Sequence, residues 1–284
     1  MTRSLTVARL DDGGRLEVVR LGVRYAESAC PERSDEGVIE PISFVEGPLM
    51  PGVQRFGPFQ LTVSLDAAGD VASYGLQVRN LAEVPLHLES VVLGFRWTQI
   101  QTDALRFLRH GWQSWSFTGP RVLDTAGAPV FPSGPWLRGI HHGVGASPPD
   151  RAGWHESDLV SVVGGAPSAA ACLAGVLESG EGTGLIYLKP DLDGVRVEVE
   201  VRFEVPLAAG EVRSVERIRL ALGDDPNRLL EEYADQLGRA AGARTGSPFQ
   251  AGWCSWYQFF HGITEEGLLR NLEGLAASRE QIPV

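Results

Sequence analysis

Residues 194–205 read GVRVEVEVRFEV, a stretch in which valine or phenylalanine alternates with charged residues. Successive side chains of a β-strand point to opposite faces, so the stretch predicts a strand with one buried face and one wet face. Five more segments alternate in this way between Gly, Pro, Asp or Asn turns: 15–25, 59–66, 72–81, 86–97 and 212–222. Because no helix pattern separates them, the sequence predicts a mainly β protein whose residues 1–225 form a large antiparallel β-sandwich.

The pattern changes to that of a helix at residue 226. Asp224 and Asp225 precede Pro226, and either aspartate can cap a helix whose first turn accommodates the proline. Four apolar residues then recur at helical spacing, Leu229, Leu230, Tyr233 and Leu237. We expect a helix over 226–240 and, together with the stretch that follows it, a helix-and-linker region over 226–248.

The last part of the sequence predicts one unit of an α/β repeat. Residues 251–260 read AGWCSWYQFF, a short apolar run that favours a strand. Thr264 can cap a following helix, whose first turn holds Glu265 and Glu266 where the helix dipole favours negative charge. Residues 282–284 have the composition of the start of a further strand. We therefore expect residues 249–284 to form a strand and a helix and then to stop.

The charge and apolar content of the chain exclude several classes of partner. A formal net charge of -11 over 284 residues argues against binding to nucleic acid or to an anionic membrane, since both need clustered basic surface. No segment approaches the length of apolar run that crosses a bilayer. The N-terminal residues lack the apolar core of a secretory signal. Neutral ligands such as sugars remain compatible with this composition.

Cysteine and histidine usage gives no indication of a metal or of a disulfide framework. Cys30, Cys172 and Cys254 are odd in number, far apart and without CxxC spacing, which favours a cytoplasmic protein. Residues 118–155 form a long stretch rich in Gly and Pro that contains His141, His142 and His155. Their spacing is not one of the recognised zinc-ligand patterns. We expect neither a metal nor another cofactor.

Two copies of a GWxSW motif, at residues 111–115 and 252–256, are the most conspicuous features of the sequence. Tryptophan presents a broad apolar face with a polar N–H edge, which suits the C–H face and hydroxyl rim of a pyranose. The alternative is that these rings only fill the core. The polar residues beside the motifs favour a cleft: Gln113, Ser114, Ser116, Gln258 and His261.

Pairs of acidic residues are the candidates for catalysis, because cleavage of a glycosidic bond requires two opposed carboxylates. Three pairs lie at helix starts or on helix faces, where capping and solvation explain them: Asp224/Asp225, Glu231/Glu232 and Glu265/Glu266. Glu156 and Asp158 are two residues apart and are predicted to share one face of a strand. Nothing else marks them as catalytic, so no catalytic residue is predicted in this chain.

Four segments resemble the α-galactosidases of glycoside hydrolase family 36. Residues 252–272, GWCSWYQFFHGITEEGLLRNL, resemble the first strand and helix of the catalytic barrel, and residues 110–119, HGWQSWSFTG, resemble a loop of the N-terminal sandwich. HESDLV at 155–160 and the helix at 224–239 fall where that family has similar segments. The resemblance implies a β-supersandwich followed by a linker helix and a (β/α)8 barrel, of which only the first βα unit lies in residues 249–284.

The family resemblance also implies an activity and a set of site residues. It implies retaining hydrolysis of terminal α-linked galactosides, with Trp115, Trp256 and Tyr257 binding the substrate. The catalytic aspartates of the family lie on later barrel strands, and a full barrel takes about 250 residues, so this chain is expected to be inactive alone. Related enzymes act on α-N-acetylgalactosamine or transfer galactose, and the sequence leaves this choice open.

Two other functions remain open at this stage. The chain is alternatively a non-catalytic carbohydrate-binding β-sandwich, or a structural subunit that another chain completes. An unpaired apolar strand is a template for association. We therefore expect residues 249–284 to self-associate, to be poorly ordered, or to pair with a chain that carries the rest of the barrel.

Overall fold

The computed structural model describes most of the chain, in thirteen stretches: residues 5–9, 15–27, 33–34, 37–38, 43–47, 51–98, 105–112, 116–124, 153–165, 170–177, 182–246, 248 and 253–278. The chain divides into two compact units, Met1–Ala241 and Gly242–Val284. All of the described strands belong to the first unit, and its described residues also contain the helix α1 (Pro226–Ala240). The described part of the second unit contains only helices.

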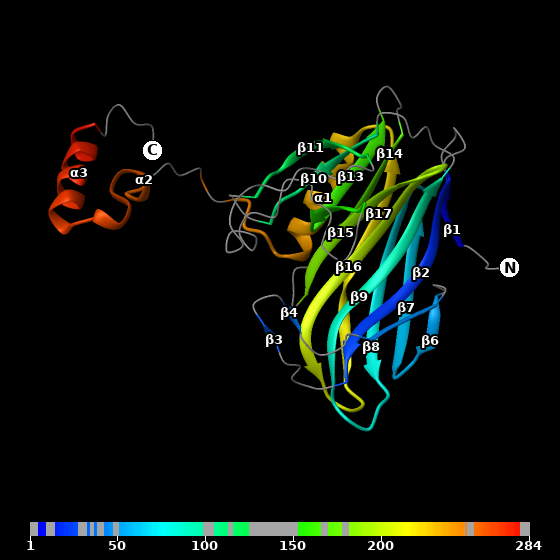
Figure 1. Ribbon diagram of the computed structural model, residues 1–284. Helices are drawn as coiled ribbons and strands as arrows, with labels where there is room; N and C mark the ends of the chain where they lie inside the picture. Colours follow the sequence, from blue (N-terminus) through cyan, green and yellow to red (C-terminus); the bar gives the residue numbers. More distant parts are fainter. Residues whose placement is uncertain are drawn as a thin grey trace. The chain divides into compact units, whose positions relative to one another are not determined.

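The first unit contains two large antiparallel sheets (Figure 1). In the seven-stranded sheet the order is β1 (Leu5–Arg9), β2 (Arg15–Ala26), β9 (Leu86–Thr98), β16 (Gly194–Leu207), β15 (Thr183–Asp191) and β12 (His155–Asp158), and β5 (Ser43–Gly47) also pairs with β2. In the eight-stranded sheet the order is β11 (Gly119–Val122), β10 (Leu105–Arg109), β13 (Val160–Gly165), β14 (Ala171–Val176), β17 (Val212–Gly223), β8 (Val71–Asn80), β7 (Phe59–Ala68) and β6 (Gly52–Phe56). A small ribbon joins β3 (Arg33–Ser34) to β4 (Gly37–Val38). The predicted mainly β, antiparallel fold is confirmed.

The core is built from residues that alternate along the strands. Val195, Val197, Val199 and Val201 of β16 all belong to the main apolar cluster, which takes residues from both sheets. The opposite side of β16 differs from the expectation of a wet face, because Glu198 and Glu200 are 5% and 2% exposed. The reason lies in the neighbouring strands: Arg20 of β2 pairs with Glu198, and Ser90 of β9 donates a hydrogen bond to Glu200. These carboxylates are buried because their strand lies inside the sheet, and the alternation of the sequence does not reveal where in a sheet a strand lies.

Helix α1 (Pro226–Ala240) lies against the eight-stranded sheet. It begins where predicted, and Asp225 is the cap: its carboxylate accepts hydrogen bonds from the backbone N–H groups of Asn227 and Arg228. Tyr233 donates from its hydroxyl to the carbonyl oxygen of Val176 at 2.5 Å. A second apolar cluster forms between helix and sheet from Val160, Val162, Ala171, Leu173, Leu177, Ala221, Leu229 and Tyr233.

The second unit departs from the prediction at its first element. Residues 253–260 contain no strand, and Trp256–Phe259 instead form a short helix, α2, continued by a 3-10 turn, η2 (Phe260–Gly262). The predicted strand at 251–260, and with it the first βα unit of a barrel, is therefore not observed. A strand needs a neighbour for its backbone hydrogen bonds, and the described residues of this unit offer none. The N–H groups of Gln258 and Phe259 donate locally, to the carbonyl oxygen of Ser255.

The helix predicted after this segment is confirmed. Helix α3 spans Glu265–Ala277, and the hydroxyl of Thr264 accepts a hydrogen bond from the N–H of Gly267 at 3.1 Å. None of its residues is buried within the structure. In the parts of the chain that the structure describes, no helix has both the length and the apolar content needed to cross a membrane.

Candidate functional site

The first GWxSW motif lies in the loop of the β10–β11 hairpin. Arg109 pairs with Gly119 in register and closes a loop over residues 110–118. Trp112 is exposed on this loop. Trp115 and its neighbours 113–114 lie outside the described residues, so the predicted role of Trp115 stays a prediction.

His110 ties the start of this loop to the seven-stranded sheet. Its backbone N–H donates to the hydroxyl of Ser157, and its carbonyl oxygen accepts from the N–H of Asp158, both at 2.8 Å. Its ring Nδ1 donates to the carbonyl oxygen of Asp158 at 2.8 Å, because a carbonyl can only accept. Three hydrogen bonds to one short strand, β12, fix the position at which the loop leaves β10.

Gly111 is required where the two ends of the loop approach each other. A Cβ atom at this position would collide with the side chain of Ser116 and would lie 2.9 Å from the carbonyl oxygen of Phe117. The N–H of Gly111 donates to the hydroxyl of Thr118 at 3.0 Å. Close packing of the backbone therefore explains the glycine of the first GWxSW motif.

Glu156 and Asp158 reach the same basic group. The Nη2 atom of Arg109 lies 3.7 Å from Oε1 of Glu156, and its Nη1 atom lies 3.5 Å from Oδ2 of Asp158. Arg109 is only 1% exposed, so an uncompensated charge there would be very costly. The two carboxylates balance a buried guanidinium, which explains them without a catalytic role.

Arg109 is the main residue that reasoning from the sequence missed. The signal was present in the segment LRFLRH, where Leu105, Phe107 and Arg109 occupy alternate positions. The first two point into the core, and the same periodicity places Arg109 inside as well. A charged residue at a core position indicates that a counter-charge lies nearby.

The last residue of the second GWxSW motif, Trp256, and Tyr257 directly after it present their rings to solvent, whereas Trp253 is half-buried beside Phe259. Trp256 and Tyr257, both predicted to bind substrate, are 42% and 90% exposed. The ring of Trp256 packs against Phe260 in a tilted arrangement, with centroids 4.5 Å apart and an interplanar angle of 48°, and His261 meets it edge-on at 5.7 Å. Trp256 and Tyr257 lie on a helical turn, so their side chains do not alternate between the two faces of a strand, as the predicted strand at 251–260 would require. Their grouping with Trp115 stays a prediction.

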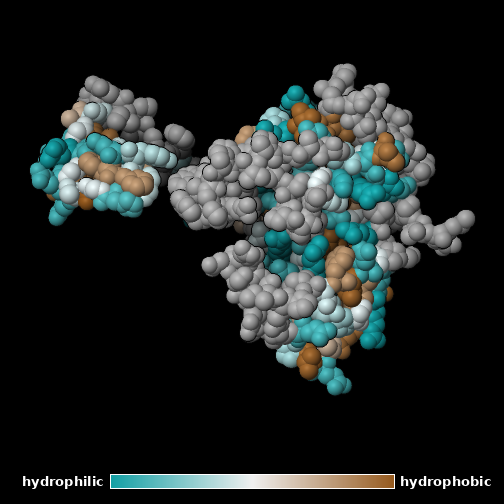
Figure 2. All heavy atoms as spheres, in the orientation of Figure 1, coloured by the Kyte–Doolittle hydropathy of each residue, from teal (hydrophilic) through white to brown (hydrophobic). Residues whose placement is uncertain are grey.

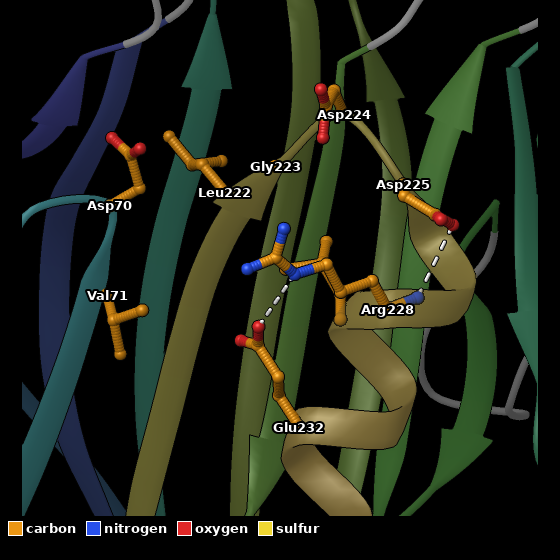
Figure 3. A pocket seen from close by; sticks show the side chains of 9 residues that line it. Asp70, Val71, Leu222, Gly223, Asp224, Asp225, Arg228 and Glu232 are labelled. Carbon is orange, nitrogen blue, oxygen red and sulfur yellow. Dashed lines mark hydrogen bonds and ion pairs between the residues drawn. The ribbon is translucent and has the colours of Figure 1, made fainter.

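A surface cavity of about 290 Å³ lies where β17 passes into α1 (Figure 3). Its polar side chains are engaged with each other. Asp225 caps the helix, and Nε of Arg228 lies 3.0 Å from Oε1 of Glu232. These contacts explain Asp225 and Glu232 by capping and ion pairing, so one member of each of the two acidic pairs at the helix has a structural role.

The histidines do not assemble a metal centre within the described ranges. His155 is buried, donates from Nε2 to the carbonyl oxygen of Asp124 at 2.6 Å and packs on Phe107. His141 and His142 lie outside the described residues. Among the residues that are described, no group of three or more His, Cys, Asp or Glu side chains is placed to hold a metal ion.

No protein-family model matches the chain. Three solved structures of GH36 α-galactosidases show a low similarity to it. AgaB from Geobacillus stearothermophilus has a TM-score of 0.44 and 13% identity, and the alignment covers 95% of this chain and 37% of AgaB. For the enzyme from Lactobacillus brevis the TM-score is 0.45, the identity 10% and the coverage 96% and 36%; for a variant of AgaA from G. stearothermophilus in complex with raffinose they are 0.41, 13%, and 95% and 37%. The chain spans little more than a third of the length of each. At these values the similarity assigns neither a family nor an activity to the chain.

Proposed function

We propose that this chain forms the N-terminal part of a retaining α-galactosidase-like glycoside hydrolase that acts on terminal α-linked galactosides. The observation that carries the proposal is the exposed aromatic surface of the second GWxSW motif, where Trp256 and Tyr257 face solvent beside His261. A tryptophan or tyrosine face that is not used in a core is suited to stack on the apolar face of galactose.

The carboxylates of the chain support a binding role rather than a catalytic one. Glu156 and Asp158 are occupied by Arg109. In the family that the motifs resemble, the catalytic aspartates lie on later barrel strands than the segment matched here. We therefore assign Trp115, Trp256 and Tyr257 to substrate binding and no residue of this chain to bond cleavage.

The proposed organisation is a sandwich over 1–225, a helix and linker over 226–248 and the start of the barrel over 249–284. Residues 251–260 would become a strand only beside a neighbouring barrel strand, because strand pairing supplies the hydrogen bonds that α2 now makes locally. The chain would then pair with another chain, or with a further segment, that carries the rest of the barrel.

A second candidate, a structural subunit completed by another chain, is favoured by the apolar surface of the second unit. Phe260, Ile263, Leu269 and Leu272 are all exposed. Clustered apolar side chains of this kind mark association surfaces. Self-association of this surface is the simplest form of the alternative.

Activity and binding assays on the purified chain test the proposal. We expect no turnover of an aryl α-galactoside by the chain alone, and turnover when a polypeptide with the remaining barrel strands is added. In the reconstituted enzyme Trp256→Ala and Tyr257→Ala should raise KM for raffinose at least about tenfold, the loss expected for one good stacking contact. Leu192→Ala, at a fully exposed apolar position of the sandwich, is the matched control.

Two results would overturn the proposal. One is turnover by the chain alone that survives a contamination control and disappears in Glu156→Gln. The other is a reconstituted enzyme whose kinetics are unchanged in both aromatic variants. Concentration-dependent dimers of the chain in light scattering, without any reconstituted activity, would favour the structural subunit.

A further inference from the structure

The outer side of the seven-stranded sheet carries a compact group of charged and hydroxyl side chains around β16. We call this group the polar face; it consists of Arg20, Arg24, Ser90, Tyr187, Glu198, Glu200 and Arg202. The strand register places them together, since Glu198 is paired with Tyr187, and Arg202 with Ser90. All point away from the valines that β16 gives to the core. Figure 2 shows hydrophilic residues, beside a smaller hydrophobic patch, over the middle of this sheet.

The centre of the polar face is Glu200, which is almost fully buried. Ser90 donates to its Oε1 atom at 2.7 Å. The Nε atoms of Arg24 and Arg202 lie 3.8 Å and 3.6 Å from the same oxygen, one from each side. Two guanidinium groups thus converge on one carboxylate at distances too long for hydrogen bonds.

The two arginines leave donors unused beside this carboxylate. The Nε atoms of Arg24 and Arg202 are buried and have no hydrogen-bond partner. Their side chains as a whole are 28% and 40% exposed, so they form the part of the cluster that solvent reaches. A ligand does not reach the buried Nε atoms, so the other guanidinium nitrogens of these partly exposed side chains are the donors that an oxygen-rich ligand would meet.

The charges of the polar face nearly cancel. Burial alone would lower the pKa of Arg202, but Tyr187, Glu200, Glu156 and Glu89 together raise it above the ordinary value, so the guanidinium stays charged. Arg20 pairs with both Glu46 and Glu198. A surface with many donors and acceptors and little net charge does not select an ion, and it suits a neutral ligand with several hydroxyl groups.

An aromatic ring lies at the side of this cluster. The guanidinium groups of Arg20 and Arg24 lie over Phe44 of β5, at 5.7 Å and 5.1 Å from the ring centroid. Phe44 is partly exposed. Phe44 therefore packs against the two guanidinium groups and places an apolar ring beside the donors and acceptors of the polar face.

We propose that the polar face is a binding site for a neutral saccharide, separate from the aromatic surface of Trp256 and Tyr257. Arg24 and Arg202 donate from their guanidinium groups to neighbouring sugar hydroxyls, and Glu200, which is almost fully buried, holds both guanidinium groups in place. The site lies wholly on the first unit, so it does not rest on the proposed hydrolase function and holds for a binding sandwich as well.

Titration of the full chain with galactose, glucose and raffinose, followed by calorimetry or by saturation-transfer NMR, tests the site. Glucuronate serves as a charged comparison. We expect at least one neutral sugar to bind, and Arg24→Lys and Arg202→Lys to weaken its binding by about tenfold to a hundredfold, because lysine keeps the charge but loses the planar, multi-donor guanidinium group. Arg79→Lys, at an exposed position of β8, is the matched control and should bind as the unchanged chain does.

The variants also separate this site from the proposed function. A double variant Trp256→Ala/Tyr257→Ala should retain sugar binding if the polar face is the site. Loss of binding in that variant with full binding in Arg24→Lys and Arg202→Lys would overturn the inference and leave the aromatic surface as the site. Failure of all three neutral sugars to bind at tens of millimolar would overturn it too, without bearing on the reconstituted hydrolase activity.

Discussion

The two units of the chain use the same kinds of side chain in opposite ways. In the sandwich most of the described aromatic residues of the strands are buried, as Phe59, Phe95, Trp97 and Phe107 are, and Phe44 is an exception. In the second unit Trp256, Tyr257 and Phe260 are exposed. The difference shows that residue type does not decide burial by itself. A ring is buried where a second sheet faces it, and the second unit as described has no sheet.

The helices of the two units make the same point. Helices α1 and α3 both begin at a side-chain cap, Asp225 in one and Thr264 in the other. Helix α1 buries Leu229 and Tyr233 against strands, whereas α3 buries nothing. Local sequence is therefore sufficient to start a helix, and packing is a separate requirement.

The largest expected difference between the units comes from truncating a ring in each. Phe95→Ala should lower the free energy of unfolding by about 3–5 kcal/mol, because it leaves a cavity in the sandwich core. Phe260→Ala, at an exposed position, should stay within about 0.5 kcal/mol. Urea unfolding followed by circular dichroism measures both. A similar loss in the two variants would contradict the difference between the units.

A glycine in each unit gives a smaller contrast. A Cβ at Gly175 would lie 2.5 Å from the ring of Tyr233, so Gly175→Ala should displace α1 and cost about 1–3 kcal/mol of stability. Gly274 in α3 has open space around it, and Gly274→Ala should strengthen that helix by up to about 1 kcal/mol. Thermal unfolding and helix content report the two effects. A neutral Gly175→Ala would mean that α1 is not held tightly on its sheet.

The cysteines provide a contrast that depends on pH. Burial raises the pKa of the Cys172 thiol to about 12. The unfolded chain releases this proton near its ordinary value of 9.0 while the folded chain retains it, so the unfolded state binds fewer protons and stability falls as pH rises. From pH 8 to pH 10 the free energy of unfolding should fall by about 1.4 kcal/mol from this group.

Cys172→Ala should remove that part of the pH dependence, and a slope that persists in the variant would exclude Cys172 as its source. Cys254 is exposed in the second unit. It should react quickly with a thiol reagent in the folded protein, in a phase that Cys254→Ser removes. Protection of Cys254 would show that the second unit is covered in solution.

The smallest contrast concerns the two caps. Asp225→Ala and Thr264→Ala should each cost their helix about 1 kcal/mol. The first loss should appear in the unfolding of the sandwich, because α1 packs on it. The second should reduce helix content and hydrogen-exchange protection in α3 alone. Equal effects of both variants on sandwich unfolding would show that the units unfold together.

Parts of the fold that depend on short-range pattern were predictable. Period-two alternation located β16, and the aspartates before Pro226 together with that proline located α1. The run at 251–260 misled because strand and helix are hard to distinguish in a short apolar segment. Pairing with a neighbour decides between them, and no local signal reports whether a neighbour is present.

The candidate sites divide in the same way. The GWxSW motifs were visible in the sequence, and the exposure of Trp256 and Tyr257 agrees with residues that have no role in a core. Arg109 and the polar face were not visible as sites. Their members come from strands that are far apart in the sequence, such as Arg24 of β2 and Arg202 of β16. Their proximity can be recognised only once the order of strands in the sheet is known.

The sequence by itself determined the positions of six strands of the sandwich (β2, β7, β8, β9, β16 and β17), the starts of both long helices and the negative net charge, since alternation, caps and net charge are properties of short segments or of composition. The tertiary structure alone decided which charged residues are buried. Glu198 and Glu200 alternate with valines like any exposed residues, yet lie in the middle of a seven-stranded sheet where arginines from other strands cover them. The physical reason is that burial of a charge depends on what lies across the sheet, and only the folded chain brings those partners within a few ångströms.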